Sequence, residues 1–214
     1  MLNYIPYVIA AVICLSIHEL SHGVAAYLFG DDTAKSEGRI SLNPLRHIDP
    51  VGFLMLVIFH FGWAKPVHVD MRRFRNPKLG MAATAFAGPL SNFLLAALLM
   101  PVFGIIAAVG TSWSDTAYNY TLQFLAITMR LSVSLGVFNL FPIPPLDGSK
   151  VVEAVLPEQT YYQIMRYERI GMIVLLVAVW SGILDTPLLA VTNWVYNNLL
   201  YLAQWSYDLA NMIF

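Results

Sequence analysis

The sequence predicts an all-α polytopic membrane protein with about five transmembrane helices and a re-entrant or β-hairpin segment at membrane level. Of the 214 residues, 58% are hydrophobic and only 12% are charged, whereas soluble domains carry about 25% charged residues. Long stretches without a charged side chain also recur along the chain. These observations exclude an ordinary soluble domain and a disordered chain. The net charge of -1 provides no basic excess, so no nucleic-acid partner is expected.

Three apolar regions each predict one transmembrane helix in the first two thirds of the chain. A helix needs roughly 20 apolar residues to cross the bilayer core, where its backbone must satisfy its own hydrogen bonds. The first 17 residues carry no charged side chain, and the apolar run resumes after His22. Residues 79–114 contain no charged residue, and residues 116–146 contain only Arg130. An arginine near mid-span must find partners, and we interpret Arg130 as structural rather than catalytic.

The C-terminal part predicts two further helices, because residues 170–184 and 186–207 also lack charged side chains. The former is expected to span the membrane. The latter is rich in Trp, Tyr and Asn, which fits either a span or a helix at the membrane interface. The whole chain, 1–214, is expected to form one membrane-embedded domain with its core at about 8–155 and additional helices at 160–214.

A shorter apolar run interrupts the polar stretch between the first two helices. Residues 51–63, VGFLMLVIFHFGW, are too few to span a bilayer and are rich in β-branched and aromatic types. They predict the re-entrant or β-hairpin segment, buried against protein at membrane level. His47, His60 and His68 flank or lie in this run and are interpreted as polar loop residues rather than metal ligands.

Basic residues concentrate on one side of the predicted topology. Eleven of the twelve lie in the stretches 30–78 and 148–169. By the positive-inside rule, these two loops are expected to face the cytoplasm. The residues concerned are Lys35, Arg39, Arg46, Lys65, Arg72, Arg73, Arg75, Lys78, Lys150, Arg166 and Arg169.

The stretch from His18 to His22 has the pattern His-Glu-x-x-His within a predicted helix. Side chains four residues apart share a helical face, so both imidazoles can reach one zinc ion while Glu19 borders the water that the ion activates. The carboxylate can take a proton from that water and pass it to the leaving amine. Ionisable groups at membrane depth are costly and therefore functional by default. The alternative is a pair of structural histidines paired with Glu19 in a polar bundle core.

Asp147 is the candidate for the third protein ligand, which a zinc site with an open water position requires. It follows FPIPPL at 141–146, where three prolines prevent a regular helix and leave backbone carbonyls unpaired. At membrane depth such a backbone is tolerated only against protein or beside a wet cavity. Gly148 allows the chain to turn closely beside the carboxylate. A helix cap is the alternative role for Asp147.

Three motifs occur in order along the chain: SIHELSHG at 16–23, AGPLSN at 87–92 and NLFPIPPLDG at 139–148. The loop after the first motif adds GRISLNP and FGWAKPV. Over about residues 8–155, this combination resembles the site-2 protease family of intramembrane zinc metalloproteases, in a minimal form without a PDZ-like or CBS-like domain. The resemblance implies regulated intramembrane proteolysis, in which a transmembrane segment of another protein is cut. We expect a location in the plasma membrane of a prokaryote.

The resemblance also assigns roles to individual residues at the matching positions. It implies His18, His22 and Asp147 as the ligands of one Zn²⁺ ion, with Glu19 as the general acid/base.

Two asparagines receive roles in substrate binding from the same resemblance. Asn139 would hydrogen-bond the substrate backbone or the developing oxyanion, which suits an amide that can both donate and accept. Asn92 would do similar work, and an interhelical hydrogen bond is its alternative.

The expected partners are the lipid bilayer, a transmembrane protein substrate and a regulatory membrane protein. A substrate helix must unwind before it is cut, and an exposed strand edge at 51–70 would hold the unwound chain. The two C-terminal helices, with Gly171 and Gly182, would admit the substrate laterally. The alternative function is a non-proteolytic membrane zinc-binding protein or transporter.

Overall fold

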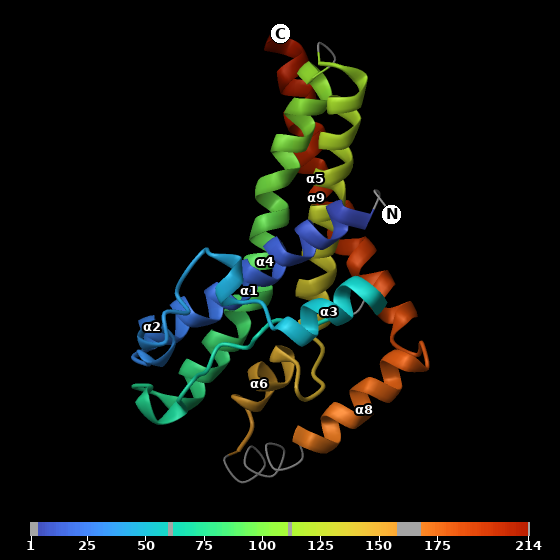
Figure 1. The fold of residues 1–214 in the computed structure, drawn as a ribbon. Coiled ribbons are helices and arrows are strands. Elements are labelled where there is room, and N and C mark those ends of the chain that lie inside the picture. The colour runs from blue at the N-terminus through green and yellow to red at the C-terminus, as the bar shows by residue number, and fades with distance from the viewer. Residues whose placement is uncertain (1–3, 60–61, 111–112, 158–167, 214) are drawn as a thin grey trace.

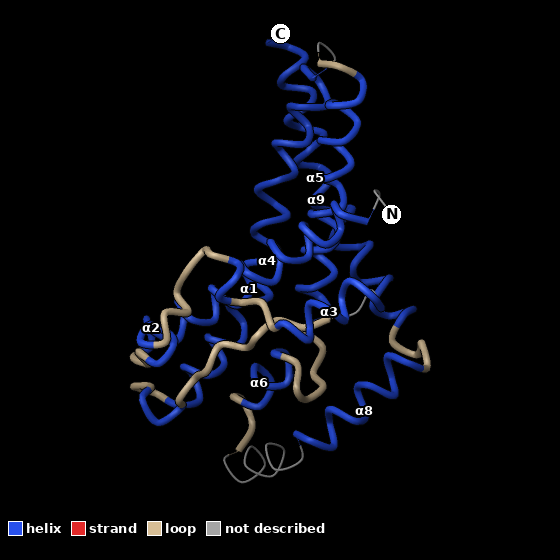
Figure 2. The backbone as a smooth tube through the Cα atoms, viewed as in Figure 1, coloured by secondary structure: helices blue, strands red, loops and turns tan. Residues whose placement is uncertain are grey.

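The structure is built from helices joined by loops, as the computed structural model shows, and the described residues form no strand (Figure 2). This agrees with the predicted all-α class. His60 and Arg166 lie outside the part of the chain that is described. The described ranges are 4–59, 62–110, 113–157 and 168–213. The α-helices are α1 (Ile5–Phe29), α2 (Thr33–Ser36), α3 (Pro50–Phe59), α4 (Pro77–Val109), α5 (Asp115–Asn139), α6 (Asp147–Glu153), α8 (Glu168–Trp180) and α9 (Asp185–Ile213).

The helices α4, α5 and α9 run side by side as a column (Figure 1). Met100 of α4, Met129 of α5 and Ala203 of α9 are buried where these helices meet. Gly104 permits the close approach of α9, because a Cβ at this position would lie 3.0 Å from the carbonyl carbon of Ala203. Helix α1 packs against α4 and α5 and so brings its His-Glu-x-x-His pattern into the packed part of the molecule.

Three helices, α1, α4 and α5, are long and apolar enough to cross a membrane. The pair α8 and α9 passes the same test together, but the two helices meet at 83° and form a broken span or a re-entrant loop. Helix α8 ends at Trp180, and Gly182, with a φ of 71°, lies in the turn before α9. The described residues thus provide three candidate spans, or four if the bent pair is one span. The count of five stays a prediction.

The apolar run at 51–63 forms helix α3 over residues 50–59, so the β-hairpin alternative is wrong for this stretch. Among the described residues around this run, one antiparallel bridge joins Ile48 and Ala64 and closes the loop around the helix. The reason lies before the run: the Asp49 carboxylate accepts the N–H of Gly52 at 2.8 Å, and Pro50 fits the first turn of a helix. Re-entry of this helix into the membrane stays a prediction.

Arg130 in α5 finds its partners on α9. Its guanidinium donates to Asn193 Oδ1 at 2.7 Å and lies 5.5 Å from the ring centroid of Tyr196. The amide oxygen thus accepts a hydrogen bond from the guanidinium, and the aromatic face forms a cation–π contact with it. This arrangement supports the structural interpretation of Arg130.

A buried carboxylate ties the loop that precedes α4 to the end of α1. Asp31 follows α1 directly and is fully buried. Its oxygens accept the N–H and hydroxyl of Thr33 and, at 2.7 Å, the N–H of Asp70. Burial alone would raise the pKa of Asp31, but these hydrogen bonds and the charge of Arg73 hold the pKa below its ordinary value. The ionised carboxylate therefore stabilises this junction.

We expect Asp31→Asn to reduce the dependence of stability on acid pH. Because the folded pKa of Asp31 is depressed, its stabilisation is present above about pH 4 and is lost as pH falls through the folded pKa. Thermal unfolding in detergent should therefore show a melting temperature that falls about 2–4 °C further between pH 7 and pH 3 in the wild type than in Asp31→Asn. Parallel curves for the two proteins would contradict this role.

Candidate metal centre and active-site cavity

Three ligand atoms from distant parts of the sequence converge inside the protein. His18 and His22 project from one face of α1 and are only 4% and 9% exposed. Asp147 begins α6, 129 residues after His18. Its Oδ2 lies 3.1 Å from His18 Nε2 and 3.3 Å from His22 Nε2, and the two Nε2 atoms are 3.0 Å apart.

This spacing fits a tetrahedral zinc ion. Ligand atoms about 2.0–2.1 Å from a tetrahedral centre lie roughly 3.3 Å from one another. The outer ring nitrogens face acceptors: His18 Nδ1 is 2.7 Å from Asn92 Oδ1, and His22 Nδ1 is 2.7 Å from the backbone oxygen of Thr84. An acceptor holds the proton on Nδ1, so each Nε2 presents a lone pair to the centre. The donor set and its spacing therefore fit zinc.

Gly88 in α4 makes room for the two imidazoles. A Cβ at this position would lie 2.5 Å from His22 Nε2 and 2.6 Å from His18 Cε1, well inside van der Waals contact. The backbone of α4 at Gly88 therefore packs directly against the two imidazoles. Because Gly88 has no side chain, α1 and α4 can approach closely here.

The proline-rich segment after α5 delivers Asp147 to the histidines. This segment contains a cis peptide bond between Pro144 and Pro145, and α6 begins immediately after Leu146. Gly148 lies against the chain just after α5, since a Cβ there would be 2.6 Å from the backbone oxygen of Phe141. The close turn expected at Gly148 is therefore present, and it fixes α6 with the Asp147 carboxylate facing α1.

Glu19 lies beside the three ligand atoms and lines the same cavity. Its Oε2 accepts a hydrogen bond from the backbone N–H of Val67 at 3.0 Å. Val67 belongs to the extended loop segment 64–70, which is non-helical and runs toward the start of α4. The backbone of this loop therefore orients the carboxylate that follows the first histidine.

The candidate metal centre opens onto a cavity of about 790 Å³. Helices α1, α4, α5 and α6 contribute its inner wall, and the loop segment 64–70 and α8 complete it. Gly171 of α8 packs on the proline-rich segment, because a Cβ there would lie 2.6 Å from the backbone oxygen of Pro144. The side chains that α8 contributes are Met172, Leu175, Leu176 and Val179. The cavity thus combines an apolar wall with a polar reaction centre, as ligand cavities commonly do.

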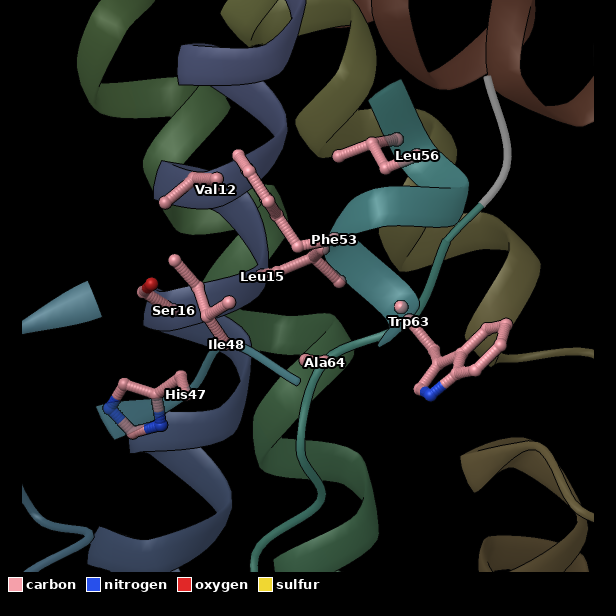
Figure 3. Close-up of a pocket in the computed structure, with 10 residues that line it drawn as sticks. Val12, Leu15, Ser16, His47, Ile48, Phe53, Leu56, Trp63 and Ala64 are labelled. Atoms are coloured by element: carbon pink, nitrogen blue, oxygen red, sulfur yellow. The ribbon is translucent and has the colours of Figure 1, made fainter. Parts of the chain in front are cut away.

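A second, smaller cavity lies between α1 and α3 (Figure 3). Val12 and Leu15 of α1 face Phe53 and Leu56 of α3 across it. Its volume of about 20 Å³ admits roughly one water molecule. His47 borders this cavity, is buried, and has its Nε2 2.7 Å from the backbone oxygen of Ser41. This histidine lies apart from the metal ligands, as expected for a loop residue.

The other described loop histidine, His68, lines the large cavity, and its Nδ1 lies 3.1 Å from the Glu37 carboxylate. The three residues that gather as a possible metal site among those described are His18, His22 and Asp147.

Sequence comparisons place the chain among known proteins. The sequence model of "Peptidase family M50" matches residues 101–182. The chain is 37% identical over 194 residues to "Putative zinc metalloprotease YwhC" of Bacillus subtilis, covering 90% of this chain and 86% of that protein. The chain belongs to peptidase family M50, the site-2 protease family.

Other relatives of this M50 protein carry similar names. Two proteins named "Putative zinc metalloprotease Rip2", from Mycolicibacterium smegmatis and Mycobacterium tuberculosis, are 29% and 28% identical to it. These alignments cover 92% and 87% of this chain and 71% of each relative. No solved structure matches the chain. The family membership confirms the resemblance drawn from the three motifs. The chain is thus a member of a family of membrane zinc metalloproteases.

The two asparagines for which the sequence predicts substrate binding occupy different surroundings. Asn139 is the last residue of α5 and lines the large cavity. Asn92 is fully buried, and besides its contact with His18 its Nδ2 lies 3.3 Å from both Cys14 O and Ser132 Oγ. These bonds join α1, α4 and α5, which is the interhelical role left open by the sequence. They also place Asn92 behind a ligand histidine.

Three groups at the site were not identified from the sequence. Gly88 stands within AGPLSN, so the motif itself was the available signal, although its steric role was not evident. The carbonyl of Thr84 and the N–H of Val67 are backbone groups, and no side-chain pattern marks them. Only the packing of α4 and of the loop segment 64–70 against α1 brings them to the histidine and the carboxylate.

We expect Gly88→Ala to weaken zinc binding by about 10- to 100-fold, the range typical of disturbed supporting contacts. The added methyl group would displace His18 and His22 from their present positions. Zinc affinity of the detergent-solubilised protein, measured by competition with a chromogenic chelator, provides the test. Gly23→Ala is the matched control, because a Cβ there makes contacts of 3.4 Å or more. Equal affinities in the two variants would contradict the steric role.

We expect Asn92→Ala to weaken zinc binding about tenfold or more, because His18 Nδ1 would lose its acceptor. Asn92→Asp keeps an acceptor oxygen and should retain more of the affinity than Asn92→Ala. The same chelator competition measures both variants. A normal zinc affinity in Asn92→Ala together with a raised KM would instead assign this residue to substrate binding.

Proposed function

We propose that this M50 protein is an intramembrane zinc endopeptidase that hydrolyses peptide bonds within transmembrane segments of other proteins, as in regulated intramembrane proteolysis. The observation that carries the proposal is the convergence of His18, His22 and Asp147, with donor atoms 3.0–3.3 Å apart, beside Glu19 in one cavity. Both histidines come from α1, which is long and apolar enough to cross a membrane. Hydrolysis would therefore occur at membrane depth.

The side chains around the cavity supply the remaining chemistry. When bound, a single zinc ion supplies the Lewis acidity that makes water nucleophilic near neutral pH. Glu19 accepts the proton of the attacking water as the new C–O bond forms and delivers a proton to the amide nitrogen as the C–N bond breaks. Asn139 Nδ2 donates one hydrogen to Leu135 O at 3.0 Å, and its second hydrogen would donate to the carbonyl oxygen, whose negative charge grows in the transition state.

An unwound stretch of the substrate, rather than an intact helix, is expected to enter the cavity. A helix holds each backbone carbonyl in an internal hydrogen bond, so local unwinding is needed to free the scissile carbonyl for attack.

The loop segment 64–70 is our candidate for holding the unwound substrate, which narrows the edge expected at 51–70. Its inward N–H groups are already used: Lys65 donates to His47 O at 2.8 Å and Val67 donates to Glu19. Pro66 has no N–H. Asp70 donates to Asp31, so among the described residues of this segment the backbone N–H groups of His68 and Val69 are left to pair with an added strand. Helix α8, opposite this segment, would admit the substrate laterally.

The cellular setting is proposed from the family membership and from the distribution of basic residues. The protein would reside in the plasma membrane of a prokaryote, with the loops 30–78 and 148–169 in the cytoplasm and a membrane protein as regulatory partner. A zinc transporter is the alternative from another class. A transport path needs several ligand clusters, and within the described residues the metal-ligating groups form one, which favours the protease.

We expect Glu19→Gln to abolish cleavage of a co-expressed single-span substrate, by at least about 100-fold, because the proton acceptor is lost. Zinc content should stay unchanged, since Glu19 is not among the three ligand atoms. His18→Ala should lose both zinc and cleavage. Mass spectrometry of the products locates the cut, which should fall within the apolar span. Cuts confined to soluble loops, or full activity in Glu19→Gln, would refute the proposal.

A further inference from the structure

One charged side chain on the cavity wall has no part in the chemistry described above. Lys150 lies one turn after Asp147 in α6 and lines the cavity together with it. It is partly buried. Among the described residues it forms no hydrogen bond or ion pair, and it is the one Lys or Arg that lines this cavity.

We infer that Lys150 is a specificity residue that binds a carboxylate of the substrate close to the scissile bond. The inference rests on the proposed proteolytic function and goes beyond it by naming a chemical feature of the substrate. An ammonium group that loses water when a substrate fills the cavity needs an acceptor, since a charge buried without a partner is costly. None of the described residues that line the cavity accepts a hydrogen bond from Lys150, so the substrate is the source of the acceptor in this proposal.

The balance of formal charge in the cavity points the same way. Glu19 and Asp147 carry one negative charge each, which a divalent cation at the candidate centre would neutralise. The charge of Lys150 then remains. An acidic residue of the substrate completes the balance, whereas a lysine or arginine in the same place would be repelled.

A lysine at this position also disfavours the binding of transmembrane segments that carry basic flanks. Transmembrane helices are commonly flanked by Lys and Arg on their cytoplasmic side, and repulsion at Lys150 disfavours those flanks. Specificity obtained by rejecting the common competitor is a recurrent device in recognition. Lys150 would therefore both select an unusual acidic flank and protect ordinary membrane proteins.

The geometry of α6 limits where the acidic residue can lie. Residues three apart on a helix have Cβ atoms about 5–6 Å apart, and an extended chain advances about 3.3 Å per residue. With the reach of the lysine stem added, the contact falls about two to four residues from the scissile bond. The carboxylate can belong to an Asp or Glu side chain or to the end of the substrate chain.

The test compares single-span substrates that carry Asp, Asn or Lys at each of four positions on either side of the cut. Binding is measured in a Glu19→Gln background with fluorescently labelled substrates in micelles, and cleavage is measured in the active protein. At one position we expect Asp to bind about tenfold more tightly than Asn, the effect of a hydrogen bond between charged groups. Lys150→Gln should bring this ratio close to one, and Lys150→Glu should favour Lys over Asp. Matched substrates that end in a free carboxylate or an amide show whether the chain end is the ligand.

Arg72→Gln is the control, because it removes the same charge from an exposed residue outside both the cavity lining and the loop segment 64–70, and it should leave the Asp-to-Asn ratio unchanged. Equal binding of all substrates to the Glu19→Gln protein would overturn the inference, as would a uniform loss of affinity in Lys150→Gln. A clear Asp preference in binding without cleavage by the active protein would support the role of Lys150 while refuting the proteolytic function. The two proposals can thus fail separately.

Discussion

The structure depends on bringing two imidazole lone pairs and a carboxylate within about 3 Å of each other inside a helical bundle. Donor atoms of this kind repel one another unless a cation or a proton lies between them, and burial strengthens that repulsion. The Nε2 atoms of His18 and His22 and the Oδ2 atom of Asp147 lie 3.0–3.3 Å from one another. Two glycines allow the three groups to approach one another. Gly88 leaves room for the two imidazoles, and the close turn at Gly148 directs the Asp147 carboxylate toward α1.

The metal-ligand side of the site is tied to several helices, whereas the α8 side of the cavity is held by fewer contacts. Asn92 links the His18 ring to the backbone of α1 and to α5, so the position of one ligand depends on three helices at once. In contrast, α8 reaches the site mainly through its side chains on the cavity wall and lies apart from the column of α4, α5 and α9 (Figure 1). A fixed ligand cluster beneath a separate covering helix suits a site that must admit a large substrate.

The sequence predicts those parts of the site that follow from side-chain type and spacing. The i, i+4 histidines require only a helix, and the prolines before Asp147 already mark a broken backbone at membrane depth, so these residues could be placed together. Backbone partners such as the Thr84 carbonyl leave no trace in composition. The run at 51–63 misled because apolar, β-branched residues suit a buried strand or a helix equally. Asp49 and Pro50, the helix-start signal that decides between them, stand just outside that run. The bend between α8 and α9 was likewise hidden, because continuous apolarity reports burial or lipid contact and carries no information on direction.

Under the proposed function, the hydrogen bond between Val67 and Glu19 would couple substrate binding to catalysis through the backbone. The loop segment 64–70 is held at two points, by Val67 at the Glu19 carboxylate of α1 and by Asp70 at the buried Asp31 carboxylate just after α1. A substrate strand that pairs with this segment is therefore registered against α1, the same helix that carries both histidine ligands. Glu19 belongs to α1, so a substrate strand paired with this loop would also be placed relative to the Glu19 carboxylate. The scissile bond and its proton acceptor would consequently be aligned through α1.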